Sequence, residues 1–461
     1  MRSGVLTKTL FQSGLACTKR LWWEVHEPDA PELLPDAQTQ WMFRQGQEVT
    51  IAAQSRVPGA RYEATLQTEA LHARVDILEP LDRGAHALIE VKGSNEIKVE
   101  HKWDVAFQRY VAATAGIDVA RAELMYLNRE CRHPDLDPLF VRKDVSDDIA
   151  PLVAQVPAVA ARFMAVLEGP LPGDSRNANC GDCPFYDRCW PQERFGVNRF
   201  YRMKWSDKLA LERGGAASFT KVPKATKLTS IQRRQQEAAH AGAVVVDHAL
   251  GTALEEWTGP LVYLDFETVA FAIPRFPGTT PWTKIPVQYS AHREEGAGHQ
   301  HVFFLADGDG DPRRALAESL VEHCAGDGAV VTYHSSFEKS CIRGLAEAVP
   351  ELGEALMQIH ERVVDLEPMV AHHVYHPDFK GSFSLKVVLP TLCPDVTYDG
   401  LTISDGSTAQ LELARVLYGV APIPGVERDV LRAGLLAYCE RDTWAMVALH
   451  RQLKELVAAA D

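Results

Sequence analysis

Two carboxylates stand two residues apart inside an apolar segment, LVYLDFETV, at residues 261–269. Because side chains alternate along a strand, Asp265 and Glu267 are expected on the same face of a sheet. Two negative charges placed this way repel each other and lose hydration when they are buried. Magnesium or manganese is the usual partner of clustered carboxylates, and two such ions about 3.5–4 Å apart suit phosphodiester hydrolysis. The segment therefore predicts a site for Mg²⁺ or Mn²⁺.

Such a site needs further acids from elsewhere in the chain. Glu338, in YHSSFEKS, is predicted at the start of a helix that follows a strand, and Asp442 lies in AYCERDTWAM. Tyr438 precedes Asp442 by four residues and so shares its helical face, where a phenol could orient the attacking water. Alternatively, Glu338 caps its helix and Asp442 is a solvated helix acid. The order of the motifs along the chain favours the metal site.

These residues resemble the motifs of the DnaQ-like, or DEDD, 3′–5′ exonucleases. Their first motif is Asp-x-Glu, matched by Asp265 and Glu267, and their last is Tyr-x3-Asp in the tyrosine branch, matched by Tyr438 and Asp442. The middle motif departs from the family, since Phe-Asp is replaced by Phe-Glu at Glu338. Asp365, in VVDLEP, is a further candidate acid.

The first half of the chain carries a second acidic pattern. Asp76 ends one predicted strand, HARVDILEP, and Glu90 and Lys92 stand two residues apart on the next, ALIEVKGS. Asp followed by Glu-x-Lys resembles the PD-(D/E)xK nucleases, which implies that the carboxylates hold magnesium and that the lysine positions water or stabilises phosphate charge. A cross-strand ion pair is the alternative explanation.

Two neighbouring segments extend this resemblance. Glu48, in RQGQEVTIAAQ, lies on a predicted upstream helix, where related nucleases place a Glu or His ligand. Gln108 and Tyr110, in DVAFQRYVA, resemble the Gln-and-Tyr motif of RecB-type nucleases.

The cysteines point to a cofactor. NCGDCPFYDRCW gives Cys180-x2-Cys183-x5-Cys189, with Cys17 far upstream, and four thiolates suit a zinc ion or an iron–sulfur cluster. The pattern resembles the iron–sulfur nucleases, including the AddB nuclease domain and the Cas-four exonucleases, which implies a [4Fe–4S] cluster, with zinc as the alternative. The remaining five cysteines lie in apolar segments and are predicted to be core residues: 131, 324, 341, 393 and 439.

The chain as a whole resembles a bacterial family, long catalogued as a domain of unknown function, that joins a RecB-like nuclease to a DnaQ-like exonuclease. RFPGTTPWTKIPVQYS, SSFEK, GSFSLKVVLPTL and AYCERDT carry this resemblance. The expected class is α/β. A restriction-endonuclease-like PD-(D/E)xK domain is expected at 1–205, a basic helical linker at 206–250 and a ribonuclease-H-like domain at 251–461. In the last domain, the patterns at 262–269, 287–294, 301–306 and 328–335 predict strands, and 428–457 predicts a helical region.

Charge is distributed unevenly. The net charge is −14, yet residues 188–234 hold twelve Lys or Arg and only three acids. This basic segment is either a solvated linker or a guide for a nucleic-acid strand. Its aromatic residues could stack on bases or pack as interdomain core: Trp190, Phe195, Phe200, Tyr201 and Trp205.

Together these features predict a two-site, metal-dependent nuclease that acts on nucleic acid, with DNA favoured over RNA. The rival hypothesis is a nucleic-acid-binding or scaffold protein in which one or both sites are inactive. We find no segment typical of a membrane span or of a secretory leader, and therefore expect a cytoplasmic protein.

Overall fold

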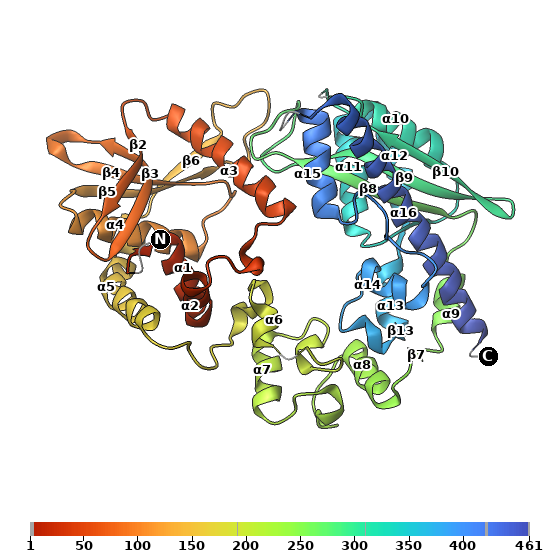
Figure 1. Cartoon of the computed structure of the whole chain (residues 1–461). Coiled ribbons are helices and arrows are strands. Elements are labelled where there is room, and N and C mark those ends of the chain that lie inside the picture. Colours follow the sequence, from red (N-terminus) through yellow and green to blue (C-terminus); the bar gives the residue numbers. More distant parts are fainter. Residues whose placement is uncertain (1–3, 191, 309, 420–422, 460–461) are drawn as a thin grey trace. The chain divides into compact units, whose positions relative to one another are not determined.

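The computed structural model describes residues 4–190, 192–308, 310–419 and 423–459 (Figure 1). The chain forms two compact units. Unit 1 comprises Met1–Cys189 and Phe271–Thr283, and unit 2 comprises Trp190–Ala270 and Lys284–Asp461. Both contain mixed sheets with helices, so the predicted α/β class is confirmed. The basic segment after Cys189 is part of unit 2.

Unit 1 is built on a six-stranded mixed sheet. The strand order is β1-β3-β4-β5-β6, and β2 also pairs with β3. β3 and β4 are antiparallel, with Ile77 opposite Ile89, whereas β4 and β5 are parallel. The strands are β1 (Leu6–Thr7), β2 (Arg61–Gln67), β3 (Leu71–Pro80), β4 (His86–Lys92), β5 (Val119–Leu127) and β6 (Phe140–Asp144).

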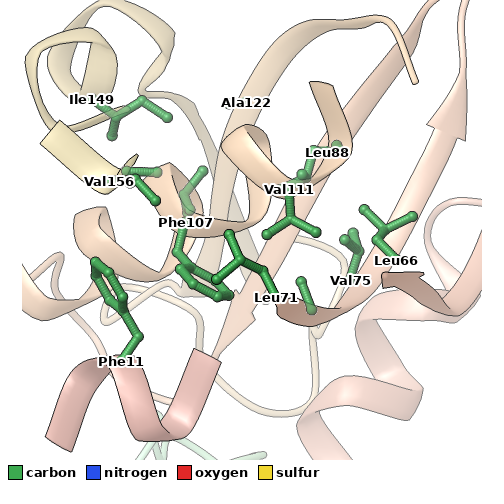
Figure 2. Packing of buried hydrophobic residues seen from close by; sticks show 14 of the residues in the cluster. Phe11, Leu66, Leu71, Val75, Leu88, Phe107, Val111, Ala122, Ile149 and Val156 are labelled. Carbon is green, nitrogen blue, oxygen red and sulfur yellow. The ribbon is translucent and has the colours of Figure 1, made fainter. Parts of the chain in front are cut away.

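Helices cover both faces of this sheet. On one face, Phe11, Phe107 and Val156 pack with strand residues such as Val75 and Leu88 (Figure 2). On the other face, α3 packs Val49 and Ala53 against Ile77 and Ile89. The helices are α1 (Lys8–Ala16), α2 (Thr18–His26), α3 (Ala37–Ser55), α4 (Val99–Thr114), α5 (Ser146–Glu168) and α6 (Tyr186–Cys189).

The segment Phe271–Thr283 comes from the second half of the sequence but belongs to unit 1. Ala272 is fully buried in the cluster that contains Val49 and Ile89. The Trp282 indole donates to the Gly93 carbonyl at 2.6 Å. Unit 1 therefore needs this segment to complete its core.

Helix α5 is, among the described residues, the helix long and apolar enough to cross a membrane by length and composition. Such a helix is weak support for a span, because a core helix passes the same test. In unit 1, Ile149, Val156 and Phe163 of α5 face the hydrophobic core that contains Phe11 and Phe107.

Unit 2 is built on a five-stranded sheet. Its order is β10-β9-β8-β11-β12, in which β8, β9 and β10 are antiparallel neighbours and β11 runs parallel to β8 and β12. A separate pair joins β7 and β13. The strands are β7 (Val245–Val246), β8 (Val262–Ala270), β9 (Lys284–Glu295), β10 (Gly298–Leu305), β11 (Val330–Thr332), β12 (Val363–Asp365) and β13 (Val374–Tyr375).

The two faces of the β8 strand meet different helices. Val262, Leu264 and Phe266 pack on α10, α11 and α12, whereas Tyr263 on the other face joins the core formed with α16. The helices are α7 (Trp205–Arg213), α8 (Ser230–Ala241), α9 (Leu250–Glu255), α10 (Arg313–Cys324), α11 (Ser336–Ala348), α12 (Gly353–Glu361), α13 (Leu366–His373), α14 (Leu385–Leu392), α15 (Gly406–Tyr418) and α16 (Gly425–Ala458).

The aromatic residues of the basic segment have mainly structural roles. Phe200 is buried against Phe219, with ring centroids 4.3 Å apart, and Trp190 is also buried. The Tyr201 hydroxyl donates to Glu367 at 2.9 Å. Phe200 and Trp190 therefore have no ring face open to stack on a base in this conformation, and Phe200 belongs to a hydrophobic cluster within unit 2.

Candidate active sites

In unit 2, three carboxylates from two elements converge on one face of the sheet. Asp265 and Glu267 lie on β8, Asp442 lies on α16, and one carboxylate oxygen of each is within 4.8 Å of the others. β8 presents its two acids together because side chains alternate along a strand. The predicted convergence of these residues is therefore present in the fold.

Glu338 reaches the same region from α11. β11 is parallel to β8, with Val331 opposite Tyr263, so α11 begins at the edge where Asp265 lies. Glu338 is buried, and its Oε2 atom has no hydrogen-bond partner. A buried carboxylate oxygen without a donor fits a position that a cation would satisfy.

Tyr398 and Lys386, which the sequence did not single out, also belong to this site. Tyr398, in the loop after α14, donates its hydroxyl to Asp442. Lys386, on α14, donates to the Tyr438 hydroxyl at 3.0 Å and to the Ser404 carbonyl at 2.8 Å. The site thus holds a cation and two phenols beside its acids.

Asp365, the further candidate acid, has a structural role. Its two oxygens accept from the backbone N–H groups of His334 and Ser335 at 3.0 and 2.8 Å, and it also caps α13 through Glu367 N–H. These bonds hold the turn that precedes α11, the helix that carries Glu338.

The clustered acids of unit 2 resist ionisation when no ion is bound. Burial and then Asp442 raise the pKa of Asp265, and burial and then Asp265 raise the pKa of Glu267. Burial, followed by Asp265, raises the pKa of Glu338 to about 9. Lys386 acts in the opposite direction on Asp265 and Glu267 but does not offset their burial. Burial also raises the pKa of Asp442. Bound cations would therefore favour the ionised form of all four acids.

We expect the metal-free protein to lose stability as the pH rises. The pKa of Glu338 is about 9 when folded against 4.5 when unfolded. Between these two pKa values the unfolded chain releases a proton that the folded chain keeps. The contribution of Glu338 to the free energy of unfolding is therefore greatest below about pH 4.5 and decreases as the pH rises towards about 9. A divalent ion replaces such protons. Mn²⁺ should therefore raise the unfolding temperature more at about pH 8.5 than at about pH 5.5. A stabilisation independent of pH, measured against EDTA, would contradict this.

In unit 1, the structure brings Asp76, Glu90 and Lys92 together at the β3–β4 pair. Asp76 accepts from the Val91 backbone N–H at 2.7 Å, and Lys92 donates to Glu90 at 2.8 Å. Glu90 is almost completely buried, and Gln108 on α4 donates to its other oxygen. These four predicted residues therefore form one cluster. Tyr110 instead packs against the hydrophobic core of this unit.

Two residues that sequence reasoning missed complete this cluster. Lys8, the first residue of α1, donates to Glu90 at 2.6 Å. Asp104, on α4, accepts from Lys92 at 2.6 Å and from Gln12 at 2.8 Å. Glu90 thus contacts two ammonium groups.

Glu48 lies on α3, as predicted, and α3 packs on one face of the sheet while α1 and α4 pack on the other. Among the described residues, the Glu48 carboxylate has two polar partners, Gln45 Nε2 at 3.5 Å and Arg275 at 3.6 Å.

The charges of the unit 1 cluster compensate one another. Burial opposes ionisation of Glu90, but Lys92 and Lys8 outweigh it and lower its pKa to about 2. Burial and then Glu90 raise the pKa of Asp76 to about 7. This site therefore holds its central carboxylate ionised without an added ion, unlike the site in unit 2.

The four predicted cofactor cysteines also lie within unit 1. Cys17 caps α2, and Asn177 links the two segments by donating its Nδ2 to the Ala16 carbonyl at 3.0 Å and its backbone N–H to Cys180 Sγ at 3.3 Å. After burial, Cys17 and Cys180 are among the groups that raise the pKa of Cys183 and Cys189. The thiols are therefore electrostatic neighbours. The other five cysteines are buried, as predicted.

Replacing Cys183 with alanine should remove a bound cluster if these thiols hold one. Anaerobically purified wild-type protein should contain about four iron and four sulfide per chain, and Cys183→Ala should lose them and become sensitive to protease. Cys131→Ala, which changes a buried cysteine of the same unit, should retain the iron. One zinc ion without iron or sulfide in anaerobic wild-type protein would contradict the prediction.

Comparison with known proteins gives a family for part of the chain. Residues 262–384 match a family described as "Domain of unknown function (DUF2779)". The matched segment contains Asp265, Glu267 and Glu338 and ends before Tyr438. This match agrees with the expected resemblance to a family of unknown function. It gives no information on whether the chain joins two nuclease domains.

Two curated relatives are distant and uncharacterised. "Uncharacterized protein UU173" of Ureaplasma parvum is 24% identical over 223 residues, or 43% of this chain. "Uncharacterized protein MG366 homolog" of Mycoplasma pneumoniae is 27% identical over 218 residues, or 42% of this chain. The matched part spans about a third of each relative's length, 32%.

One solved structure, titled "Crystal structure of SSO0001", covers 40% of this chain and 85% of its own, with 16% identity and a TM-score of 0.27. A likeness at this level carries no argument about fold or function.

Proposed function

We propose that the protein is a metal-dependent nuclease whose principal active site lies in unit 2. The observation that carries the proposal is the set of four acids, Asp265, Glu267, Glu338 and Asp442, gathered in surroundings that oppose their ionisation. All-oxygen ligand sets of this kind suit Mg²⁺ or Mn²⁺. When bound, the ions would supply Lewis-acid stabilisation of the scissile phosphate and an activated water.

The neighbouring side chains have separable roles. Tyr398 donates to Asp442, which holds that carboxylate in place and favours its ionised form. Lys386 donates to the Tyr438 hydroxyl, so the phenol oxygen acts as an acceptor towards Lys386 and its own O–H remains free to donate to another group. We propose that Tyr438 orients the attacking water and that Lys386 stabilises negative charge developing on the phosphate.

The tyrosine-branch arrangement supports digestion from a free 3′ end. We therefore propose that unit 2 is a ribonuclease-H-like 3′–5′ exonuclease. Its sheet, with three antiparallel strands followed by two parallel ones, is compatible with that fold.

For unit 1 we propose a RecB-like PD-(D/E)xK site formed by Asp76, Glu90, Lys92 and Gln108. The clustering of these four residues supports it. Lys8 favours a second candidate function, because an ammonium group already neutralises Glu90. In that alternative, unit 1 binds nucleic acid without cleaving it.

We also propose that Cys17, Cys180, Cys183 and Cys189 hold a [4Fe–4S] cluster. Four sulfurs around one zinc ion lie about 3.8 Å apart. In the described part of the chain, no three of these cysteines have their sulfur atoms all within 4.8 Å of one another. A wider arrangement of sulfurs suits a cluster better than a single zinc ion.

The proposed activity can be tested directly. The purified protein is incubated with end-labelled single- and double-stranded DNA and RNA, with Mg²⁺, Mn²⁺ or EDTA. We expect metal-dependent shortening of single-stranded DNA from the 3′ end, and resistance when that end is blocked. Metal-independent cleavage, or none on any substrate, would contradict the proposal.

A further inference from the structure

A second group of metal-type ligands lies in unit 2, outside the acidic site. His292 is on β9, His301 lies directly opposite it on β10, and Glu440 is on α16. One ligand atom from each lies within 4.8 Å of the other two. The two imidazole rings are stacked with centroids 4.7 Å apart.

One consistent assignment of the hydrogen bonds leaves a nitrogen of each ring free to bind an ion. In it the Thr443 hydroxyl donates to the Glu440 carbonyl at 3.0 Å. Thr443 Oγ1 then accepts from His292 Nδ1 at 2.9 Å and from Ser290 Oγ at 2.8 Å. Because the Ser290 proton is used in this way, Ser290 Oγ accepts from His301 Nε2 at 2.9 Å.

In this arrangement the lone pairs of His292 Nε2 and His301 Nδ1 are directed away from the hydroxyl groups. His301 Nδ1 and Glu440 Oε1, 3.7 Å apart, are then both acceptors, and a cation between them would satisfy both. Without an ion, His301 Nδ1 carries the proton and pairs with Glu440. Histidine ligands of metals commonly donate their other ring nitrogen to a fixed acceptor, as both rings do here.

We propose that His292, His301 and Glu440 bind one zinc ion. Two nitrogens and one oxygen form a ligand set that favours zinc over magnesium, unlike the all-oxygen set of the acidic site. Neighbouring ligand atoms on a tetrahedral zinc ion lie about 3.4 Å apart. Glu440, with a side chain 52% exposed, can close the remaining distance by rotation. The ion would join β9, β10 and α16, the helix that also carries Tyr438 and Asp442.

The test uses the full-length protein and measures zinc directly. Protein is equilibrated with Zn²⁺ in excess Mg²⁺, dialysed, and analysed by mass spectrometry of the elements. His301→Ala and Glu440→Ala, which alter partly exposed residues and spare the buried His292, should each lose about one zinc per chain. His299→Ala, two residues away on the same face of β10, should keep it.

Cobalt substitution separates this site from the cysteines. Co²⁺ bound by nitrogen and oxygen gives visible d–d absorption without the near-ultraviolet charge-transfer band of thiolate ligands. We expect that d–d component in wild-type and Asp265→Asn protein, and its loss in His301→Ala. Equal zinc in wild type, His301→Ala and Glu440→Ala, or cobalt spectra showing thiolate ligands alone, would overturn the proposal.

Discussion

Replacing Asp265 with asparagine should abolish metal-dependent degradation by unit 2 while making the metal-free protein more stable. Asparagine has nearly the same shape but carries no charge. The loss of one well-placed electrostatic group costs about 10²–10³-fold in rate, and we expect at least that here because the residue lies at the centre of the acid cluster.

The opposite effect on stability follows from the raised pKa of Asp265, which burial and Asp442 cause. At neutral pH the unfolded chain gains free energy by ionising this carboxyl, and the folded chain does not. Asparagine removes that difference, so the unfolding temperature in EDTA at about pH 8 should rise. Glu347→Gln, a change to an exposed acid on α11, should alter neither the rate of metal-dependent degradation nor the unfolding temperature in EDTA. Retained activity, or a fall in metal-free stability, would contradict the interpretation of this site.

The parts of the sites that follow a local repeat could be predicted from the sequence. Asp265 and Glu267 share a face because a strand alternates its side chains. Tyr438 and Asp442 share a face because residues four apart are neighbours on a helix. Glu90 and Lys92 are likewise on one strand face, and their pairing with Asp76 follows from an antiparallel connection.

The missed residues have no such repeat to reveal them. Lys8 reaches Glu90 across 82 positions in the sequence, and Tyr398 reaches Asp442 across 44. Their positions depend on how α1 and the loop after α14 pack, which no local pattern encodes.

The membership of residues 271–283 in unit 1 was also beyond sequence reasoning. The segment RFPGTTPWT is part of the family resemblance, yet its sequence is typical of an ordinary connection between two strands. Its contribution to unit 1 depends on contacts such as that of Trp282 with Gly93. A fragment ending near residue 205 would therefore lack part of the core of this unit.

Replacing Lys92 with methionine should decide whether unit 1 is a nuclease. Methionine keeps most of the apolar stem and removes the ammonium group that contacts Glu90 and Asp104. Glu90 retains Lys8 and Gln108 as partners, so the fold should survive. If Lys92 positions water or stabilises phosphate charge, products made by unit 1 should fall by about 10²–10³-fold.

The measurement compares product ladders on labelled strands for wild type, Lys92→Met, Asp265→Asn and the double variant. Each single variant should lose one set of products and keep the other, because each ligand set is complete within its own unit. Lys102 lies on α4, as Gln108 does, and forms a partly exposed ion pair with Asp148 of α5. Lys102→Ala is therefore the matched control and should behave as wild type. If Lys92→Met leaves every product unchanged while Asp265→Asn removes all of them, the site of unit 1 is inactive. Lys8 and Lys92 then only neutralise the buried Glu90. Unit 1 would then bind nucleic acid and leave cleavage to unit 2.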